Sequence, residues 1–171
     1  MESSKTFTIL HFNDVYNLQE REKEPVGGAP RFITAAAKFK DRNPLVLFSG
    51  DIFSPSKLAM IMKGKQMLPF FDNFKIDVSC VGNHDLDFGL ERFIELKEKS
   101  NHPWLFSNVF DREKSNKADS GSKIPLAGCL DHIILDHDNV KIGIIGLAES
   151  EWLDCIASMD EDEFEYEDFV E

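Results

Sequence analysis

The chain has 171 residues, of which 42% are hydrophobic, 11% aromatic and 29% charged, and this composition is that of one globular domain. Its 19 basic and 31 acidic residues give a formal charge of −12, so it repels a polyphosphate backbone and a nucleic-acid polymer is disfavoured as a partner. Eleven of the acidic residues, and no Lys or Arg, lie in residues 149–171. We therefore divide the chain into a nearly neutral part, residues 1–148, and an acidic segment, residues 149–171.

Short apolar runs bounded by Gly, Asn or Asp predict strands in residues 6–12, 45–49, 77–81 and 140–147. Apolar residues at the spacing of an amphipathic helix predict helices in residues 30–40, 57–67 and 88–99, and the second of these should end before Pro69. Strands that alternate with helices of this length are typical of βαβ units, so the sequence predicts an α/β domain.

The sequence of the later part of the chain predicts a loop, a hairpin and a solvent-exposed C-terminal segment. Residues 111–123 are polar and lack apolar periodicity, which predicts an exposed loop. Two apolar runs, residues 129–135 and 140–147, flank a polar turn and predict a hairpin. We expect the acidic segment to be a solvated tail or to contain the start of a helix at Phe169.

Polar residues that can bind metals follow three of the predicted strands. The first set is Asn13, Asp14 and Tyr16, the second is Gly50 and Asp51, and the third is Asn83, His84 and Asp85. Asp14 and Asp51 are 37 residues apart, and Asp51 and Asn83 are 32 apart, close to the ~30 residues of one βαβ unit. Because the carboxyl ends of consecutive parallel strands face a common crevice, we expect the three sets to converge there.

Oxygen ligands and one imidazole at such a crevice suit metal-assisted hydrolysis of phosphate esters. Two cations about 3.5 to 4 Å apart can share a carboxylate, hold a hydroxide and neutralise charge on the phosphoryl oxygens. Asp51, on the middle strand, is the natural bridging ligand. His84 could donate a proton to the leaving alkoxide, and Asp85 could fix the tautomer of its ring. Taken singly, Asp14 and Asp51 also fit ordinary turns, whereas a histidine adds nothing to a turn.

Four motifs resemble the calcineurin-like metallophosphoesterases, most closely their 5′-nucleotidase branch. They are HFNDVY at residues 11–16, SGDIFS at 49–54, GNHDLDFG at 82–89 and SNV at 107–109. The resemblance implies a four-layer α/β/β/α sandwich that is incomplete at the C-terminus, with residues 1–148 as the N-terminal part of its catalytic domain. It also implies that the substrate is a nucleotide or another small phosphomonoester.

The same resemblance implies a centre of two divalent ions, drawn from Mn, Zn, Fe and Mg. Asp14 matches a ligand of the first metal, Asp51 the bridging ligand and Asn83 a ligand of the second metal. His84 matches the histidine that stabilises the transition state or protonates the leaving group. Asp85 matches the partner that orients this histidine.

Two departures from the family pattern bear on activity. Tyr16 stands where the family's first motif has a histidine, and a phenol with a pKa of ~10 is a poorer ligand than imidazole at neutral pH. The family takes further histidines from later motifs, and these do not occur after Leu147. Since the loss of an outer-shell partner alone costs about 10 to 100-fold in metal affinity or activity, we expect impaired turnover by this chain.

Two functions of different class therefore stay open. The first is a metal-dependent phosphoesterase that acts on nucleotides or small phosphomonoesters. The second is a non-catalytic protein that binds metal or phosphate, or that takes part in an interaction. Residues 1–10 lack the apolar run of a signal peptide and no stretch of ~20 apolar residues occurs, so we expect a cytoplasmic protein without a membrane partner.

Overall fold

A parallel sheet lies at the centre of the fold in the computed structural model. The structure describes residues 5–118, 121–153, 160 and 162–170. Among these residues its strands are, in spatial order, β1 (Ile9–Phe12), β2 (Leu45–Phe48), β3 (Val78–Cys80) and β4 (Trp104–Leu105). Each neighbouring pair is parallel. The first three predicted strands are confirmed, and each is shorter than expected.

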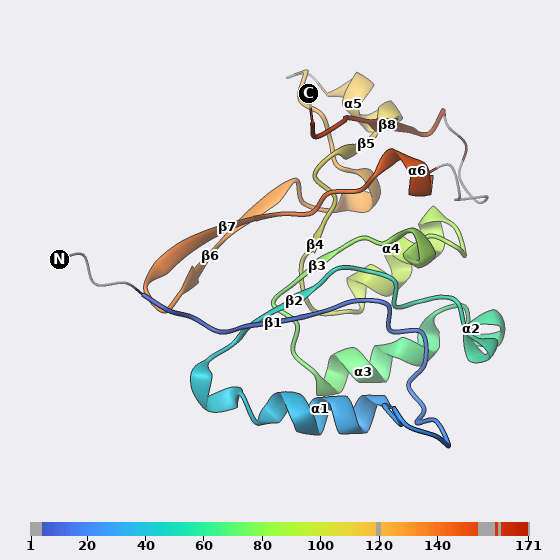
Figure 1. The fold of residues 1–171 in the computed structure, drawn as a ribbon. Coiled ribbons are helices and arrows are strands. Elements are labelled where there is room, and N and C mark those ends of the chain that lie inside the picture. The colour runs from blue at the N-terminus through green and yellow to red at the C-terminus, as the bar shows by residue number, and fades with distance from the viewer. Residues whose placement is uncertain (1–4, 119–120, 154–159, 161, 171) are drawn as a thin grey trace.

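Helices connect the parallel strands, as an α/β domain requires. The connection from β1 to β2 contains α1 (Ala29–Ala37), that from β2 to β3 contains α2 (Lys57–Met62) and α3 (Leu68–Asn73), and that from β3 to β4 contains α4 (Leu90–Glu98). In Figure 1, α1 and α3 lie below the strands. The predicted helices in residues 30–40 and 88–99 are confirmed. No helix in the described part of the chain is both long and apolar enough to cross a bilayer.

The helices beneath the sheet are held by aromatic packing. Phe32 of α1 lies 4.9 Å from Phe12 of β1, and Phe70 of α3 lies 6.2 Å from the same ring, measured between ring centroids. On the core side of β2, Phe48 packs against Trp104, which is 2% exposed. Burial of side chains of this size is the main favourable contribution to the stability of the fold.

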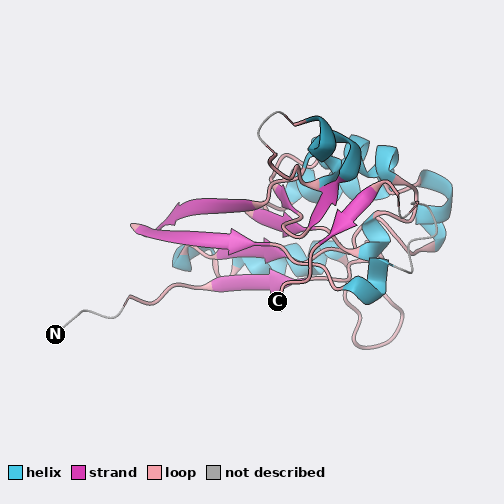
Figure 2. Cartoon of the chain, turned by 90° about the horizontal axis from the view of Figure 1, so that it is seen from above, coloured by secondary structure: helices cyan, strands magenta, loops and turns pink. Residues whose placement is uncertain are grey.

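An antiparallel hairpin lies on the other side of the parallel strands. Its strands, β6 (His132–His137) and β7 (Val140–Ile145), pair around Asp138 and Asn139, whose φ angles of 50° and 61° are typical of a two-residue hairpin turn. Figure 1 shows the hairpin above the sheet, and in Figure 2 the strands lie toward the side of the molecule where the chain begins. Helices, parallel sheet and antiparallel strands match three successive layers of the predicted sandwich.

The prediction of one helix over residues 57–67 is wrong in its second half. Lys63 and Gly64 have φ angles of 46° and 85°, so α2 ends at Met62 and a short 3₁₀ turn, Lys65–Met67, follows. A second helix, α3, then begins at Leu68 and continues through Pro69. Proline is tolerated in the first turn of a helix, because its missing N–H would have no intrahelical partner there.

The prediction of an exposed loop over residues 111–123 is also wrong in part, because it contains helix α5 (Arg112–Lys117). Asp111 caps this helix by accepting a hydrogen bond from Lys114 N at 2.8 Å, and an ion pair joins Glu113 to Lys117. The helix buries no residue. Apolar periodicity therefore could not have revealed it.

The acidic segment contacts the body of the protein, contrary to the prediction of a solvated tail. After the short helix α6 (Ser150–Leu153), strand β8 (Phe164–Tyr166) pairs antiparallel with β5 (Val109–Asp111). Lys123 Nζ lies 2.7 Å from Glu165 Oε1 and also contacts Glu167. Phe169 does not begin a helix in the described residues. The backbone pairing with β5 and the contacts with Lys123 thus explain how the acidic residues around β8 are held against the rest of the protein.

His102 is a half-buried histidine that packs against aromatic neighbours. Its ring stacks on Trp104 at a centroid distance of 5.5 Å, Nδ1 donates to Ser100 O at 2.7 Å, and Nε2 accepts from Ser79 Oγ at 2.7 Å. Both ring nitrogens are therefore satisfied in the neutral form. Burial lowers the pKa of His102 from 6.5 to about 4, against the opposing hydrogen bond to Ser100.

His102→Gln should reveal this as a pH-dependent difference in stability. The unfolded chain takes up the proton more readily than the folded one, so the contribution of His102 is complete above pH 6.5 and is lost as the pH falls toward 4. Urea unfolding should show that the stability advantage of the wild type over the variant shrinks by about 2 kcal/mol between pH 8 and pH 5. An advantage of equal size at both pH values would contradict a neutral, half-buried His102.

Candidate functional site

The loop after β1 places Asp14 and Tyr16 at the carboxyl end of the sheet. Asp14 N donates to Gly50 O at 3.1 Å, which links this loop to the one after β2. The Asp14 carboxylate accepts hydrogen bonds from the Asn13 side-chain amide and from the Tyr16 hydroxyl. Asp14 is thereby held with both carboxylate oxygens at the sheet edge, where the sequence predicted a ligand.

Asp51 lies between the other two loops. Its Oδ2 is 3.5 Å from the Tyr16 hydroxyl, and its Oδ1 accepts a hydrogen bond from His84 N at 2.9 Å. The close approach of the loops requires glycine at position 82, since a Cβ there would lie 2.6 Å from Asp51 N. The Tyr16 phenol thus lies between the carboxylates of Asp14 and Asp51, and the Asp51 carboxylate is hydrogen-bonded to the loop after β3.

The third loop brings His84 to the same place. It folds as a 3₁₀ turn, Asn83–Asp85, directly after Gly82. The rings of Tyr16 and His84 meet edge to face, with centroids 5.8 Å apart. Asn83 lies in this turn and is half-buried. The structure therefore brings Asp14, Asp51 and His84 together, with Asn83 one residue away, as the spacing of the strands predicted.

The ring of His84 is oriented by Asp87, a residue that the sequence analysis did not single out. His84 Nδ1 and Asp87 Oδ2 are 2.9 Å apart, and the Asp87 side chain is 33% exposed. The tautomer with the proton on Nδ1 satisfies this contact and leaves Nε2 free to exchange a proton. The sequence feature that could have indicated this contact is a carboxylate three residues after the histidine, across a turn.

Asp85 does not take the place that we predicted for it beside the His84 ring. Its carboxylate is 1% exposed and accepts four backbone N–H bonds of 2.8 to 3.2 Å, from Asp51, Ile52, Phe53 and Gly82. Burial outweighs these hydrogen bonds and raises the pKa of Asp85 to about 6. Asp85 is thus a positioning residue that fixes the backbone of Asp51 and of the two residues after it, and links them to Gly82.

The carboxylates of the site repel one another. Burial raises the pKa of Asp51; the His84 backbone N–H and the His84 charge lower it, and the charges of Asp14 and Asp87 raise it further. Burial and the hydrogen bond to Asp14 also raise the pKa of Tyr16, so its phenol is neutral and donates. A positive ion beside Asp14 and Asp51 would relieve this repulsion.

The donor atoms suit divalent cations that prefer oxygen ligands. Asp14, Asp51 and Asn83 offer carboxylate and amide oxygens, and Mg²⁺ in particular is held by one or two carboxylates with several bound waters. Within the described residues, no group of three or more His, Cys, Asp or Glu side chains is placed to hold an ion by itself. Water or substrate oxygens would have to complete the coordination of such an ion.

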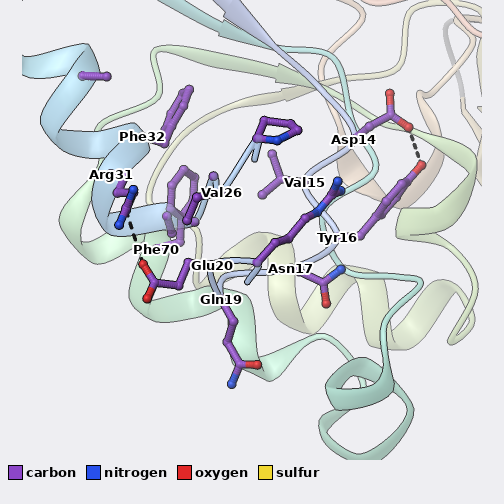
Figure 3. Close-up of a pocket in the computed structure, with 16 residues that line it drawn as sticks. Asp14, Val15, Tyr16, Asn17, Gln19, Glu20, Val26, Arg31, Phe32 and Phe70 are labelled. Atoms are coloured by element: carbon purple, nitrogen blue, oxygen red, sulfur yellow. Dashed lines mark hydrogen bonds and ion pairs between the residues drawn. The ribbon is translucent and has the colours of Figure 1, made fainter. Parts of the chain in front are cut away.

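A cavity of about 720 Å³ opens beside Asp14, between the loop after β1 and helix α1. Figure 3 shows Asp14 and Tyr16 at one end of it and the ion pair of Arg31 with Glu20 at the other. Arg31 Nε and Glu20 Oε2 are 3.3 Å apart, and both side chains are more than half exposed. An exposed pair of this kind contributes about 0 to 1 kcal/mol, so the loop is held mainly by its backbone contacts.

Comparison with known proteins identifies the family. The family model described as calcineurin-like phosphoesterase matches residues 7–169, which is most of the chain. The chain belongs to this family. The matched range includes Asp14, Asp51 and Asn83.

The relatives of this chain include nucleotidases. It is 27% identical to human 5′-nucleotidase over 157 residues and 28% identical to the snake venom 5′-nucleotidase of Crotalus adamanteus over 156 residues. Each match covers 84% of this chain and 26% of the relative, so the chain spans about a quarter of the length of these proteins. These matches support the place of the chain in the 5′-nucleotidase branch of the family, where it corresponds to the N-terminal domain.

Solved structures confirm the fold. The NAD nucleotidase of Haemophilus influenzae superposes with a TM-score of 0.76 at 22% identity, over 95% of this chain and 33% of that chain. The calcineurin-like phosphoesterase YfkN of Bacillus subtilis superposes with a TM-score of 0.73 at 18% identity, over 96% and 55% of the two chains. The predicted metallophosphoesterase sandwich is therefore the fold of this protein.

Proposed function

We propose that this chain carries metal-binding residues of a phosphoesterase that hydrolyses nucleotides or other small phosphomonoesters. The observation that supports this most directly is the convergence of three strand ends. The Tyr16 hydroxyl contacts both Asp14 and Asp51, and Asp51 is hydrogen-bonded to His84 N. Oxygen ligands and an imidazole at one sheet edge are what metal-assisted phosphate hydrolysis requires.

Each side chain has a defined task in this proposal. Asp14, Asp51 and Asn83 would hold divalent cations, two in number as the family pattern implies. Bound there, the cations would supply charge stabilisation and an activated water. His84 would protonate the leaving oxygen through Nε2, while Asp87 holds Nδ1 and so fixes the direction of the ring.

We also propose that residues 149–171 continue the catalytic domain begun by residues 1–148. The antiparallel pairing of β8 with β5 supports this, since it attaches the acidic segment to the strand that follows β4. Asn108 supports it as well, because its side-chain amide donates to Ala148 O at 2.9 Å and to Glu167 O at 3.1 Å.

A non-catalytic role is the competing proposal. It is favoured by Tyr16, whose hydroxyl occupies the place beside Asp14 and Asp51 and is a weaker ligand than imidazole at neutral pH. In this case the chain would bind a cation and phosphate but release little or no product. The two proposals differ in turnover and not in binding.

Phosphate release from AMP in the presence of Mn²⁺, Zn²⁺ or Mg²⁺ separates the two. We expect slow release that depends on the metal, is abolished by His84→Ala and falls about 10 to 100-fold in Asp87→Asn, with little change in KM. His132→Ala is the matched control, because its side chain is 58% exposed on the hairpin. Metal and phosphate binding without any release would instead establish the non-catalytic role.

A further inference from the structure

Helix α2 presents most of its apolar side chains to solvent. Met60 and Ile61 are 71% and 81% exposed. Leu58 and Met62 are 42% and 40% exposed, and Ala59 is the one buried residue of the helix. Burial of such side chains is favourable, and adjacent exposed apolar residues with a polar rim are typical of a protein–protein contact.

Three lysines surround these apolar side chains. Residues 52–71 contain Lys57, Lys63 and Lys65 and no Asp or Glu, although the whole chain has a formal charge of −12. All three lysines are exposed, and none of them forms an ion pair within the described residues. We call these lysines and the four exposed apolar residues of α2 the basic patch. A partner surface that is acidic and partly apolar would complement both of its features.

A groove of opposite charge lies where the start of α4, helix α5 and the residues before β8 meet. Its volume is about 610 Å³, and Leu90 and Leu126 line it together with five carboxylates. The carboxylates are Asp111, Glu113, Asp160, Asp162 and Glu163. The first two pair with lysines of α5. The last three are exposed and form no ion pair within the part of the chain that the structure describes. We call this surface the acidic groove.

The basic patch and the acidic groove belong to neighbouring elements. The Arg92 guanidinium of α4 donates to Met62 O at 3.1 Å and to Lys63 O at 2.7 Å, which joins the end of α2 to α4. Leu90 of the groove begins α4, two residues before Arg92. Figure 1 shows α2 and α4 on the same side of the molecule. Two complementary surfaces that lie next to each other can be paired at once by a single two-fold axis, because each contact is then made twice.

We propose that this chain forms a two-fold symmetric dimer in which the basic patch of each copy contacts the acidic groove of the other. Three unpaired lysines of one copy then meet three unpaired carboxylates of its partner, and the apolar side chains of α2 lose their exposure to water. Local pairing of opposite charges overcomes the repulsion between two acidic proteins, because the charges are unevenly distributed over the surface. This interface uses neither a metal ion nor a phosphate, so it does not depend on the proposed function.

Sedimentation velocity of the whole chain, between about 1 and about 200 µM, tests the apolar part of the interface. We expect a monomer–dimer equilibrium that Ile61→Asp weakens at least about tenfold, since the new carboxylate faces the acidic groove. Ile134→Asp is the matched control, because Ile134 is 62% exposed on β6 and belongs to neither surface. It should change the dimer affinity less than about twofold. A monomer throughout, or equal effects of the two substitutions, would overturn the proposal.

Charge reversal tests whether the patch meets the groove. One double variant, Lys57→Glu with Lys65→Glu, makes the patch acidic, and another, Asp162→Lys with Glu163→Lys, makes the groove basic. Each variant alone should stay monomeric, because like charges then oppose each other in both contacts. An equal mixture should dimerise as the wild type does, since opposite charges face each other in both contacts of the mixed dimer. A mixture that stays monomeric would refute the pairing of patch with groove, and assemblies that grow beyond the dimer would refute the two-fold axis.

Discussion

Asp85→Ala should lower the free energy of unfolding by about 3–5 kcal/mol, a large fraction of the stability of a domain of this size. The carboxylate is fully buried and accepts from four backbone N–H groups on two different loops. Alanine leaves those donors without a partner in a space that is closed to bulk water. Asp85→Asn should have a free energy of unfolding between those of the wild type and Asp85→Ala. Its amide oxygen can still accept a hydrogen bond, whereas its NH₂ group faces other donors.

Chemical denaturation at pH 7 measures this effect, and Asp87→Ala is its control. Asp87 lies two residues further on, but its side chain is 33% exposed and contacts only the His84 ring among the interactions described for it. We expect less than about 1 kcal/mol from that variant, as for other exposed ion pairs. Equal losses in the two variants would mean that Asp85 does not organise the loops around Asp51.

Asp51→Asn should weaken the binding of Mn²⁺ by more than about a hundredfold, equivalent to at least about 2.7 kcal/mol. Loss of an outer-shell partner costs about 10 to 100-fold in metal affinity, and loss of the central carboxylate should exceed that range. The fold should tolerate the change, since the Asn oxygen can still accept from His84 N. Because the pKa of Asp51 is raised, a neutral side chain also removes repulsion in the metal-free chain.

Calorimetric titration with MnCl₂ measures the loss, and thermal unfolding without metal checks the fold. Asp72→Asn on α3 is the matched control, because it removes the same charge from an exposed position. It should change Mn²⁺ affinity less than twofold. Should Asp51→Asn bind Mn²⁺ as tightly as the wild type, the cation lies elsewhere and the assignment of Asp51 as its central ligand is wrong.

The meeting of the three strand ends could be predicted because topology alone determines it. In parallel βαβ units each strand ends at the same sheet edge, so Asp14, Asp51 and His84 had to approach one another. The contacts within the site could not be predicted in the same way. Which of Asp85 and Asp87 reaches the His84 ring depends on the 3₁₀ turn at Asn83–Asp85, which directs one side chain inward and the other to the ring.

The errors in the fold have similar physical causes. Helix α5 buries no residue, so it depends on the Asp111 cap and an ion pair that leave no apolar pattern in the sequence. Strand β8 depends on β5, more than fifty residues earlier, and on Lys123. Periodicity reports burial along one element, whereas these features depend on contacts between residues far apart in the chain.

Anomalous diffraction from crystals soaked in MnCl₂ tests most directly whether Asp14, Asp51 and Asn83 hold divalent cations. We expect an anomalous peak within about 2.5 Å of a carboxylate oxygen of Asp51, with Asn83 or Asp14 as a second ligand. Peaks only at other acidic residues, with no ion beside Asp51 at saturating Mn²⁺, would contradict the claim.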